Sequence, residues 1–367
     1  MKRIVILFIG LLIFTINIGA QRRVVDAVDH TPISAASIFD ASGNIVGLTL
    51  LNGDFPDVPK SAYPITIRCI GYDQLVVEKD DDKIWEMMPA VYELEELVVV
   101  PVKRNVLKQT FYVREYFSLN NEKDSVTFFM EYMAHRFVPT TKDAKFGGNT
   151  SLRIINRSCY SRYKVGGKDS VSVDYQSKFP SLLSVYDLND KPVDVEESLK
   201  KQSGPNRLYQ KTSKSGMSLI QKQNAQTFTT IEDILAETKN HSFSPLPFKL
   251  LGMTMDINQF FMTHTYRAND SCVYLPKDLI EASFVMEADG IGKYLRKSIK
   301  SKKPIEIRSM LELYLVDSEY LSNKEAKQEY KDKEAGLMFT IPSTVPPLNA
   351  ATKRLVERAE KESKKMK

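Results

Sequence analysis

The stretch VVDAVDHTPISAASIFDASGNIVGLTLLNGDF, residues 24–55, decides the fold expected for the first part of this chain. Short apolar runs alternate with turn residues at spacings of about 8–12 positions, which is typical of small β-sandwiches. Asn52-Gly53 offers residue types that accept the positive φ angles of a tight hairpin. The same pattern continues through ITIRCI and QLVVEK to LEELVVV at Leu94–Val100. We therefore expect an all-β domain over residues 21–102.

Motif positions in this range resemble the carboxypeptidase-regulatory-like domain common in exported proteins of the Bacteroidetes. The matching positions are Val24, Asp26, Pro32, Ala36, Ile38, Gly47, Gly53, Phe55, Ile70, Gly71, Tyr72, Leu94, Glu96 and Val98–Val100. Two positions depart from the family pattern: Arg22 stands where the family usually has Gly, and Leu50 replaces an acidic residue. The resemblance implies a transthyretin-like (prealbumin/Ig-like) sandwich of about seven strands.

The resemblance also implies structural roles for the IGY turn. Ile70 would pack inward at the end of a core strand, Gly71 would let the backbone turn, and Tyr72 would cover the end of the sandwich. Val98–Val100 would then close the sandwich, with Pro101 ending the strand. The alternative is that Val98, Val99 and Val100 form an exposed edge that pairs with an envelope partner protein.

Residues 1–20 have the pattern of a secretory signal peptide. Lys2 and Arg3 precede an apolar run from Ile4 to Ile18, and small residues end at Ala20. An uncleaved membrane anchor is the competing interpretation, but a span needs about 20 apolar residues and this run is shorter and interrupted. We expect cleavage near Ala20 and an exported protein, in the periplasm or associated with the outer membrane.

Length and charge limit the classes of function. A chain of 367 residues that is 43% hydrophobic is long enough for two cores. The formal net charge is +5, and removing Lys2 and Arg3 leaves too weak an excess to predict nucleic-acid binding. The three cysteines, Cys69, Cys159 and Cys272, are too far apart for a zinc or redox motif, so we expect buried small hydrophobic residues.

After an expected linker at 103–109, the second part (110–367) has mostly strand-like patterns. They are TFYVREYFSL, SVTFFMEYM, SLRIINRS, DSVSVDYQ, EASFVME and PIEIRSMLELYLVD. A capping-box pattern at Thr229–Glu232 predicts a short helix through Lys239. Ser322 and Asn349 are expected to cap two later helices. We predict an α+β domain rich in antiparallel strands, with a C-terminal helix.

Motifs for the common enzyme classes are absent from the sequence. No histidine among His30, His135, His241 and His264 begins an H-x-x-E or H-E-x-x-H motif, so a metallopeptidase is not expected. There is no nucleophile elbow or phosphate-binding loop. His135 and His264 have aromatic neighbours and are expected to be hydrogen-bonded structural residues. The Asp80–Asp82 turn lacks spaced calcium ligands, and nothing implies a cofactor or a metal.

A carboxylate-dependent glycan hydrolase remains as an alternative. Its candidate acid pairs are Glu115 with Glu131 and Asp256 with Glu281. Such an enzyme needs two carboxyl groups that face each other at about 5–9.5 Å. With 46 acidic residues in the chain, chance also accounts for these pairs, so no catalytic residue is assigned.

A basic run between Gly292 and Lys303 holds six cations and no acid. They are Lys293, Arg296, Lys297, Lys300, Lys302 and Lys303. Its plain interpretation is a solvated surface. Its functional interpretation is contact with an anionic membrane surface or an acidic glycan, at about 1 kcal/mol per cation. The sequence therefore favours an exported, non-enzymatic binding protein whose partner is a glycan or an envelope protein.

Overall fold

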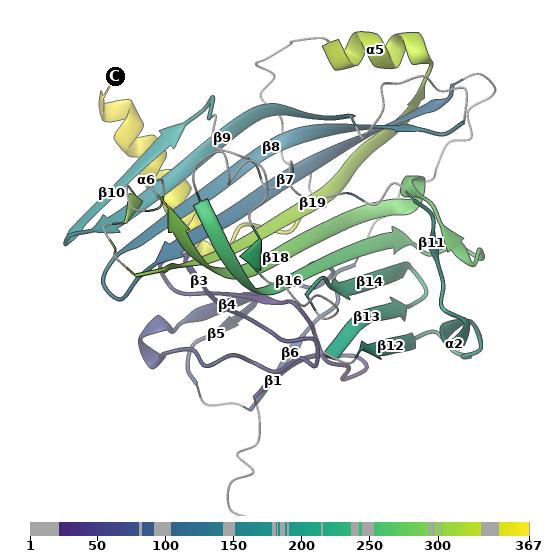
Figure 1. Cartoon of the computed structure of the whole chain (residues 1–367), viewed down its shortest axis with the longest axis horizontal. Helices are drawn as coiled ribbons and strands as arrows, with labels where there is room; N and C mark the ends of the chain where they lie inside the picture. Colours follow the sequence, from purple (N-terminus) through teal and green to yellow (C-terminus); the bar gives the residue numbers. More distant parts are fainter. Residues whose placement is uncertain are drawn as a thin grey trace, which may run out of the picture.

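Figure 1 shows the computed structural model of this chain, which places a small N-terminal part beside one large curved sheet. The structure describes residues 22–80, 83–91, 104–141, 151–177, 191–213, 216–235, 253–292, 303–331 and 345–366, with isolated positions 181, 183, 188, 242, 243, 295, 298, 299 and 301. Val98–Val100 lie outside these residues, so the expected last strand of the first part cannot be compared.

The N-terminal part consists of two small sheets around one core. Its strands are β1 (Arg23–Asp26), β2 (Ser37–Phe39), β3 (Ile45–Leu48), β4 (Ile65–Arg68), β5 (Leu75–Val77) and β6 (Ile84–Met87). Strands β1 and β6 pair in parallel, and the other four form an antiparallel sheet in the order β3-β2-β4-β5. Val24, Ile67 and Trp85 from both sheets share a hydrophobic cluster. Five strands lie in segments expected from the sequence, whereas β6 was not predicted.

The IGY turn differs in part from its expected role. Gly71 has a φ of 84°, and Gly53 a φ of 75°, so both glycines supply the left-handed conformation that their turns require. Ile70, however, packs outside the N-terminal core, against Tyr112, Tyr314 and Val345 of the second part. The turn therefore joins the two parts of the molecule rather than only closing the first.

The second part is mostly β with few helices, so the expected richness in antiparallel strands and the expected C-terminal helix are confirmed. Its antiparallel sheet has 11 strands among the described residues, in the order β10-β9-β8-β7-β19-β18-β16-β14-β13-β12, with β15 beside β16. The strands are β7 (Val106–Asn120), β8 (Ser125–Pro139), β9 (Ser151–Val165), β10 (Lys168–Asp174), β12 (Arg207–Ser213), β13 (Gly216–Gln223), β14 (Thr227–Asp233), β15 (Ser242–Phe243), β16 (Met253–Arg267), β18 (Leu279–Gly292) and β19 (Ile305–Leu321). Short strands β11 (Val193–Asp194) and β17 (Val273–Tyr274) form a separate pair.

Two segments have a different secondary structure from the one expected from the sequence. Strand β7 already begins at Val106, so the second half of the expected linker 103–109 belongs to the sheet. The helix expected from Thr229 is instead strand β14, hydrogen-bonded between β13 and β16. Residues 236–239 of that expected helix lie outside the described residues. The residues of this capping pattern are also compatible with a strand. Pairing with the distant strands β13 and β16 determines which structure forms.

The two helices expected near the C-terminus are confirmed. Helix α5 (Asn323–Lys331) begins with a capping box, in which the Ser322 backbone N–H donates to Glu325 at 2.8 Å. Helix α6 (Ala350–Met366) begins after Asn349, whose side-chain oxygen accepts the N–H of Thr352 at 2.8 Å. Three short helical segments also have their bounds within the described residues: η1 (Lys60–Ala62), α2 (Glu197–Lys200) and η3 (Pro276–Asp278). In the part of the chain that is described, no helix has the length and apolar character of a membrane span.

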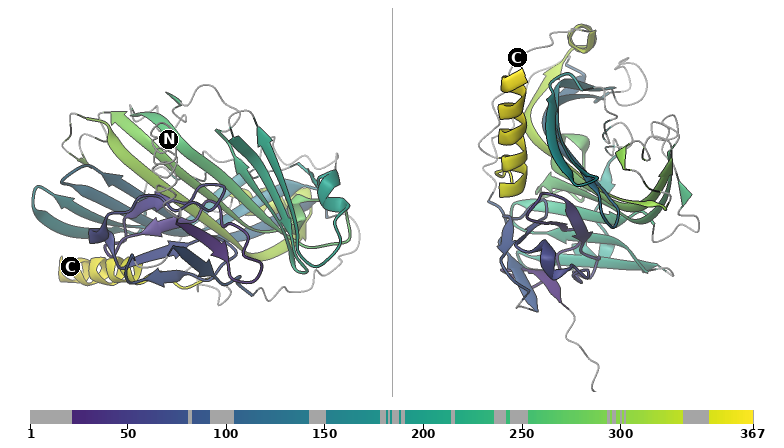
Figure 2. Two further views of the ribbon diagram at one scale, coloured as in Figure 1. Left: turned by 90° about the horizontal axis from the view of Figure 1, so that it is seen from below. Right: turned by 90° about the vertical axis from the view of Figure 1, so that its left-hand side faces the viewer.

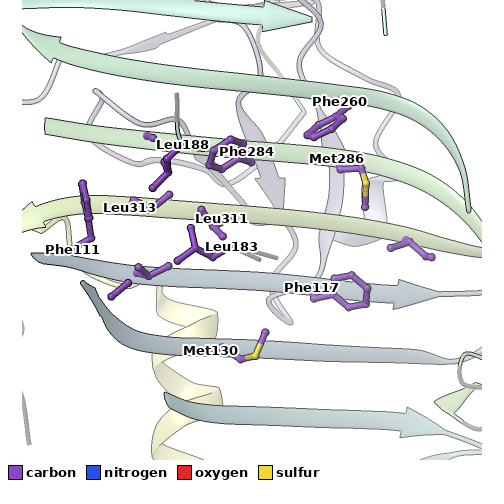
Figure 3. Packing of buried hydrophobic residues seen from close by; sticks show 14 of the residues in the cluster. Phe111, Phe117, Met130, Leu183, Leu188, Phe260, Phe284, Met286, Leu311 and Leu313 are labelled. Atoms are coloured by element: carbon purple, nitrogen blue, oxygen red, sulfur yellow. The ribbon is translucent and has the colours of Figure 1, made fainter. Parts of the chain in front are cut away.

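The large sheet is strongly curved, and its two faces have different roles (Figure 2). The concave face carries an apolar cluster that includes Phe111, Phe284 and Leu313 (Figure 3). The convex face carries Tyr116 and Met310 and is covered by α6 and by strands β2 and β3 of the N-terminal part. Alternate residues of β7 and β19 thus contribute to two separate cores.

Candidate functional site

A pocket of about 220 Å³ lies between the N-terminal part and the convex face of strands β12, β13, β14 and β16. Lys222 of β13, Thr229 of β14 and Thr265 of β16 line one wall. Asp26 and Tyr72 belong to the opposite wall. Because side chains alternate along a strand, the neighbours of these wall residues point into the concave core instead, as Phe228 and Tyr266 do.

The two walls meet at the ammonium group of Lys222. Its Nζ donates to Asp26 at 2.8 Å and to the Thr31 hydroxyl at 3.0 Å, and it lies 3.3 Å from an Asp29 oxygen. The Tyr72 hydroxyl donates to Asp26 at 2.9 Å and lies 3.3 Å from the same ammonium. Five side chains from both parts therefore form one hydrogen-bonded network.

The network fixes the protonation states of its members. Burial would raise the pKa of Asp26, but the hydrogen bonds from Lys222 and from the Val28 backbone N–H outweigh it and lower that pKa. Burial and the charge of Asp26 raise the pKa of Tyr72. At neutral pH Asp26 is therefore a carboxylate and Tyr72 a neutral hydroxyl donor.

The rest of the polar wall is neutral. The hydroxyl groups of Thr229 and Thr265 lie 3.3 Å apart on neighbouring strands, and the Thr227 hydroxyl donates to Asn224 at 3.1 Å. The remaining polar lining is made of amide and hydroxyl side chains: Ser34, Asn206, Gln210, Gln226 and Thr263. Apolar side chains such as Val28 and Ile231 complete the wall.

A buried ion pair joins the N-terminal part to the large sheet next to the pocket. Arg68 of β4 binds both oxygens of Glu312 on β19 at 2.9–3.1 Å, and their side chains are only 4% and 1% exposed. Burial would lower the pKa of Arg68, but the charge of Glu312 and the neighbouring tyrosines raise it. Arg68 also donates to the Pro347 carbonyl at 3.0 Å. The position of the IGY turn, which begins two residues after Arg68, is thus fixed relative to the sheet.

Cys69 lines the pocket, and its environment favours the protonated thiol over the nucleophilic thiolate. Burial and the charges of Glu281 and Glu312 raise the pKa of its thiol to about 12. All three cysteines are free, and only Cys159 is buried, while Cys69 is partly exposed and Cys272 is exposed. The expectation of three buried cysteines is therefore wrong for two of them.

The candidate binding residues from the sequence lie elsewhere or cannot be placed. Lys293, Arg296, Lys297, Lys300 and Lys302 lie outside the described residues. Lys303 is described, and it pairs with Glu122 at 3.1 Å with both side chains 80% exposed. An exposed pair of this kind contributes little to stability. The membrane-contact hypothesis for this run stays a prediction, as does the docking-edge hypothesis for Val98–Val100.

The acid pair Glu115 and Glu131 cannot act together. Glu131 lies opposite Arg114 in the β7–β8 register, whereas Glu115 lies opposite Met130. The two carboxyl groups therefore point to opposite faces of the sheet. Glu115 is buried and accepts from Tyr132 and Ser181 on the concave side.

The pair Asp256 and Glu281 also fails as a catalytic pair. In the β16–β18 register Asp256 lies opposite Asp289, and Glu281 lies opposite Thr265. Nine residues of β16 separate these positions, which corresponds to about 30 Å along an antiparallel strand. The expected facing geometry is absent for both pairs.

The two histidines in the sheet are buried or half-buried, but the expected full hydrogen bonding is wrong for His264. His264 is 3% exposed, its ring packs edge-on against Phe284, and its Nε2 has no hydrogen-bond partner among the described residues. Burial and the charge of Arg136 lower its pKa to about 4. Burial also lowers the pKa of His135 to about 4.

Sequence reasoning missed Lys222, Asp29 and the threonine wall. Lys222 lies 196 residues from Asp26 in the sequence. A lone lysine in a polar strand is usually solvated, so its place at the centre of the pocket depends on tertiary packing. The only local signal is a threonine-rich strand, TFTTIED, whose alternate hydroxyls face one side.

Comparisons with known proteins leave the family open. No family model and no curated protein matches the chain. A solved structure titled as lipid–protein interactions in lipovitellin aligns with 66% of this chain at 10% identity and a TM-score of 0.29. The chain spans 28% of that lipovitellin chain, and a similarity of this size carries no argument about fold or function.

Proposed function

We propose that this chain is an exported, envelope-associated binding protein without catalytic activity, and that its pocket binds a glycan. The observation that carries the proposal is the pocket itself. Its walls come from both parts of the molecule and present hydroxyl, amide and carboxylate groups around the fixed position of Lys222. Such groups complement sugar hydroxyls, which both donate and accept hydrogen bonds.

The size of the pocket also fits this proposal. Its 220 Å³ is smaller than the about 300–1,000 Å³ typical of sites for drug-sized ligands. A pocket of this volume suits one small ring or the end of a longer chain. Apolar groups such as Val28 and Ile231 offer contacts for the C–H faces of a sugar ring.

The N-terminal part is proposed to be a carboxypeptidase-regulatory-like module with a transthyretin-like sandwich. The motif positions support this assignment, as do two small sheets around one core and the positive φ of Gly71. The pattern of residues 1–20 supports export to the periplasm or the outer membrane. An envelope protein remains the second partner class, through the segment that contains Val98–Val100.

Catalysis by the pocket acids is not favoured. A glycoside hydrolase needs one carboxyl group with a raised pKa to protonate the leaving group. The pKa of Asp26 is lowered instead, and Asp29 contacts the same ammonium group. Both carboxylates therefore suit binding better than proton transfer.

Filling the pocket tests the proposal. In Thr229→Phe, a phenyl ring would occupy space on the sheet wall, and affinity for glycans found by array screening should fall at least about tenfold. Thr254→Phe places the same ring at an exposed position of β16 outside the pocket and should retain affinity. Isothermal titration calorimetry measures both. Unchanged binding in a folded Thr229→Phe variant would overturn the pocket as the site.

A further inference from the structure

The charged groups of the pocket are unequal in number. Among the lining residues, two carry a negative charge, Asp26 and Asp29, and one carries a positive charge, Lys222. Every other described lining residue is neutral. A ligand therefore enters a small site with one excess negative charge, where solvent screening is weaker than on an open surface.

The one cation has no donor left for a ligand. An ammonium group has three N–H donors, and Lys222 already has the Asp26 carboxylate, the Asp29 carboxylate and the Thr31 hydroxyl as acceptors. The Tyr72 oxygen is a fourth neighbour at 3.3 Å. An incoming phosphate, sulfate or carboxylate could reach Lys222 only by displacing one of these groups.

Asp29, by contrast, retains capacity to accept. Its Oδ1 accepts from the backbone N–H and the hydroxyl of Thr31, at 3.0 and 2.6 Å. Its Oδ2 lies 3.3 Å from Lys222, and the side chain is 20% exposed. Because a carboxylate offers about four lone-pair sites, Oδ2 can accept a further hydrogen bond from a ligand O–H or N–H group.

We propose that the pocket selects neutral or amino-bearing sugar ends and rejects acidic ones, with Asp29 as the contacting acceptor. This inference rests on the glycan-binding function proposed above. Lys222 acts as a positioning residue, because it holds both carboxylates on the N-terminal wall against the sheet. An acidic sugar would place a second negative group beside Asp29 without a free cation to pair with it.

Matched oligosaccharides test the charge selectivity. Neutral hexose tetramers are compared by calorimetry with the uronic-acid tetramers of the same sugars, and N-acetylglucosamine tetramers with their deacetylated forms. Neutral and amino forms should bind, and each uronic form should bind at least about tenfold more weakly. Failure of every probe would overturn the glycan-binding function. Binding of uronic forms as tight as that of neutral ones would overturn the selectivity alone.

Two carboxylate variants locate the source of the selectivity. Asp29→Asn removes the excess charge but keeps an oxygen for Thr31, so the preference for neutral over uronic probes should shrink about tenfold. Asp57→Asn makes the same charge change at a fully exposed position outside the pocket and should leave the preference unchanged. Equal effects of the two variants would assign the selectivity to overall charge and overturn the role of Asp29.

Discussion

At the scale of single residues, burial of His264 in the concave core makes the stability of the protein depend on pH. Burial lowers its folded-state pKa to about 4, whereas an unfolded histidine has a pKa of about 6.5. Between these values the unfolded chain binds more protons than the folded protein. Stability therefore falls as the pH drops from about 6.5 to 4, by up to about 3 kcal/mol for this residue.

His264→Leu should remove this contribution. The free energy of unfolding, measured by urea titration at pH 7, 5.5 and 4.5, should decline less steeply in the variant than in the parent protein. Phe284→Leu is the matched control, because it changes a neighbouring ring in the same cluster without removing a titrating group. Phe284→Leu should lower the free energy of unfolding at every pH. The decline of that free energy with falling pH should be as steep as in the parent protein. An unaltered slope in His264→Leu would contradict the assignment.

At the scale of secondary-structure elements, the sequence predicts the long strands well. The segments around Phe111, Phe128 and Leu313 carry enough alternating apolar residues to indicate strands without any tertiary information. Prediction from the sequence fails where contacts between distant segments determine the secondary structure or the face on which a side chain lies. Thr229–Glu232 satisfies a helix-capping pattern and nevertheless pairs as β14, and the spacing of Glu115 and Glu131 does not reveal that they lie on opposite faces.

Helix α6 should depend on its apolar contact with the sheet more than on its surface charges. Leu355 is 6% exposed and belongs to the convex-face cluster with Tyr160 and Val171. Leu355→Ala should lower the free energy of unfolding by about 2–4 kcal/mol and increase hydrogen exchange in α6. Lys353→Ala, at an exposed position of the same helix, should change it by less than about 0.5 kcal/mol. Similar losses in both variants would argue against docking through Leu355.

At the scale of the whole molecule, the pocket exists because the two parts are fixed to each other. The Arg68–Glu312 pair joins positions 244 residues apart, and Ile70 packs beside it against Tyr112 and Tyr314. Neither contact has a signal in the local sequence. The local sequence of residues 21–102 therefore predicts a self-contained domain. In the structure, strand β4 of this range ends at Arg68, in the interface with the large sheet.

Removing one partner of the Arg68–Glu312 ion pair should lower the free energy of unfolding more than replacing both partners with apolar residues. Arg68→Met leaves the buried Glu312 carboxylate without its partner, so stability should fall by about 3–5 kcal/mol. The double variant Arg68→Met/Glu312→Leu removes both charges and should be more stable than Arg68→Met alone. Denaturant unfolding with tryptophan fluorescence from Trp85 follows the N-terminal part in each protein. A double variant less stable than the single one would contradict this account.

The contact between α6 and the N-terminal part has a consequence for the biosynthesis of the chain. Arg354 of α6 donates to the Ala41 carbonyl, 313 residues earlier, and β7 pairs in the middle of the sheet with β19. A ribosome releases β7 long before β19, and α6 emerges later than both. The surface of the N-terminal part that packs against the convex face of the sheet therefore stays uncovered until β19 and α6 have emerged. Folding with such distant contacts is slow, and the exposed apolar surface and unpaired strand edges of an unfinished chain favour aggregation during that interval.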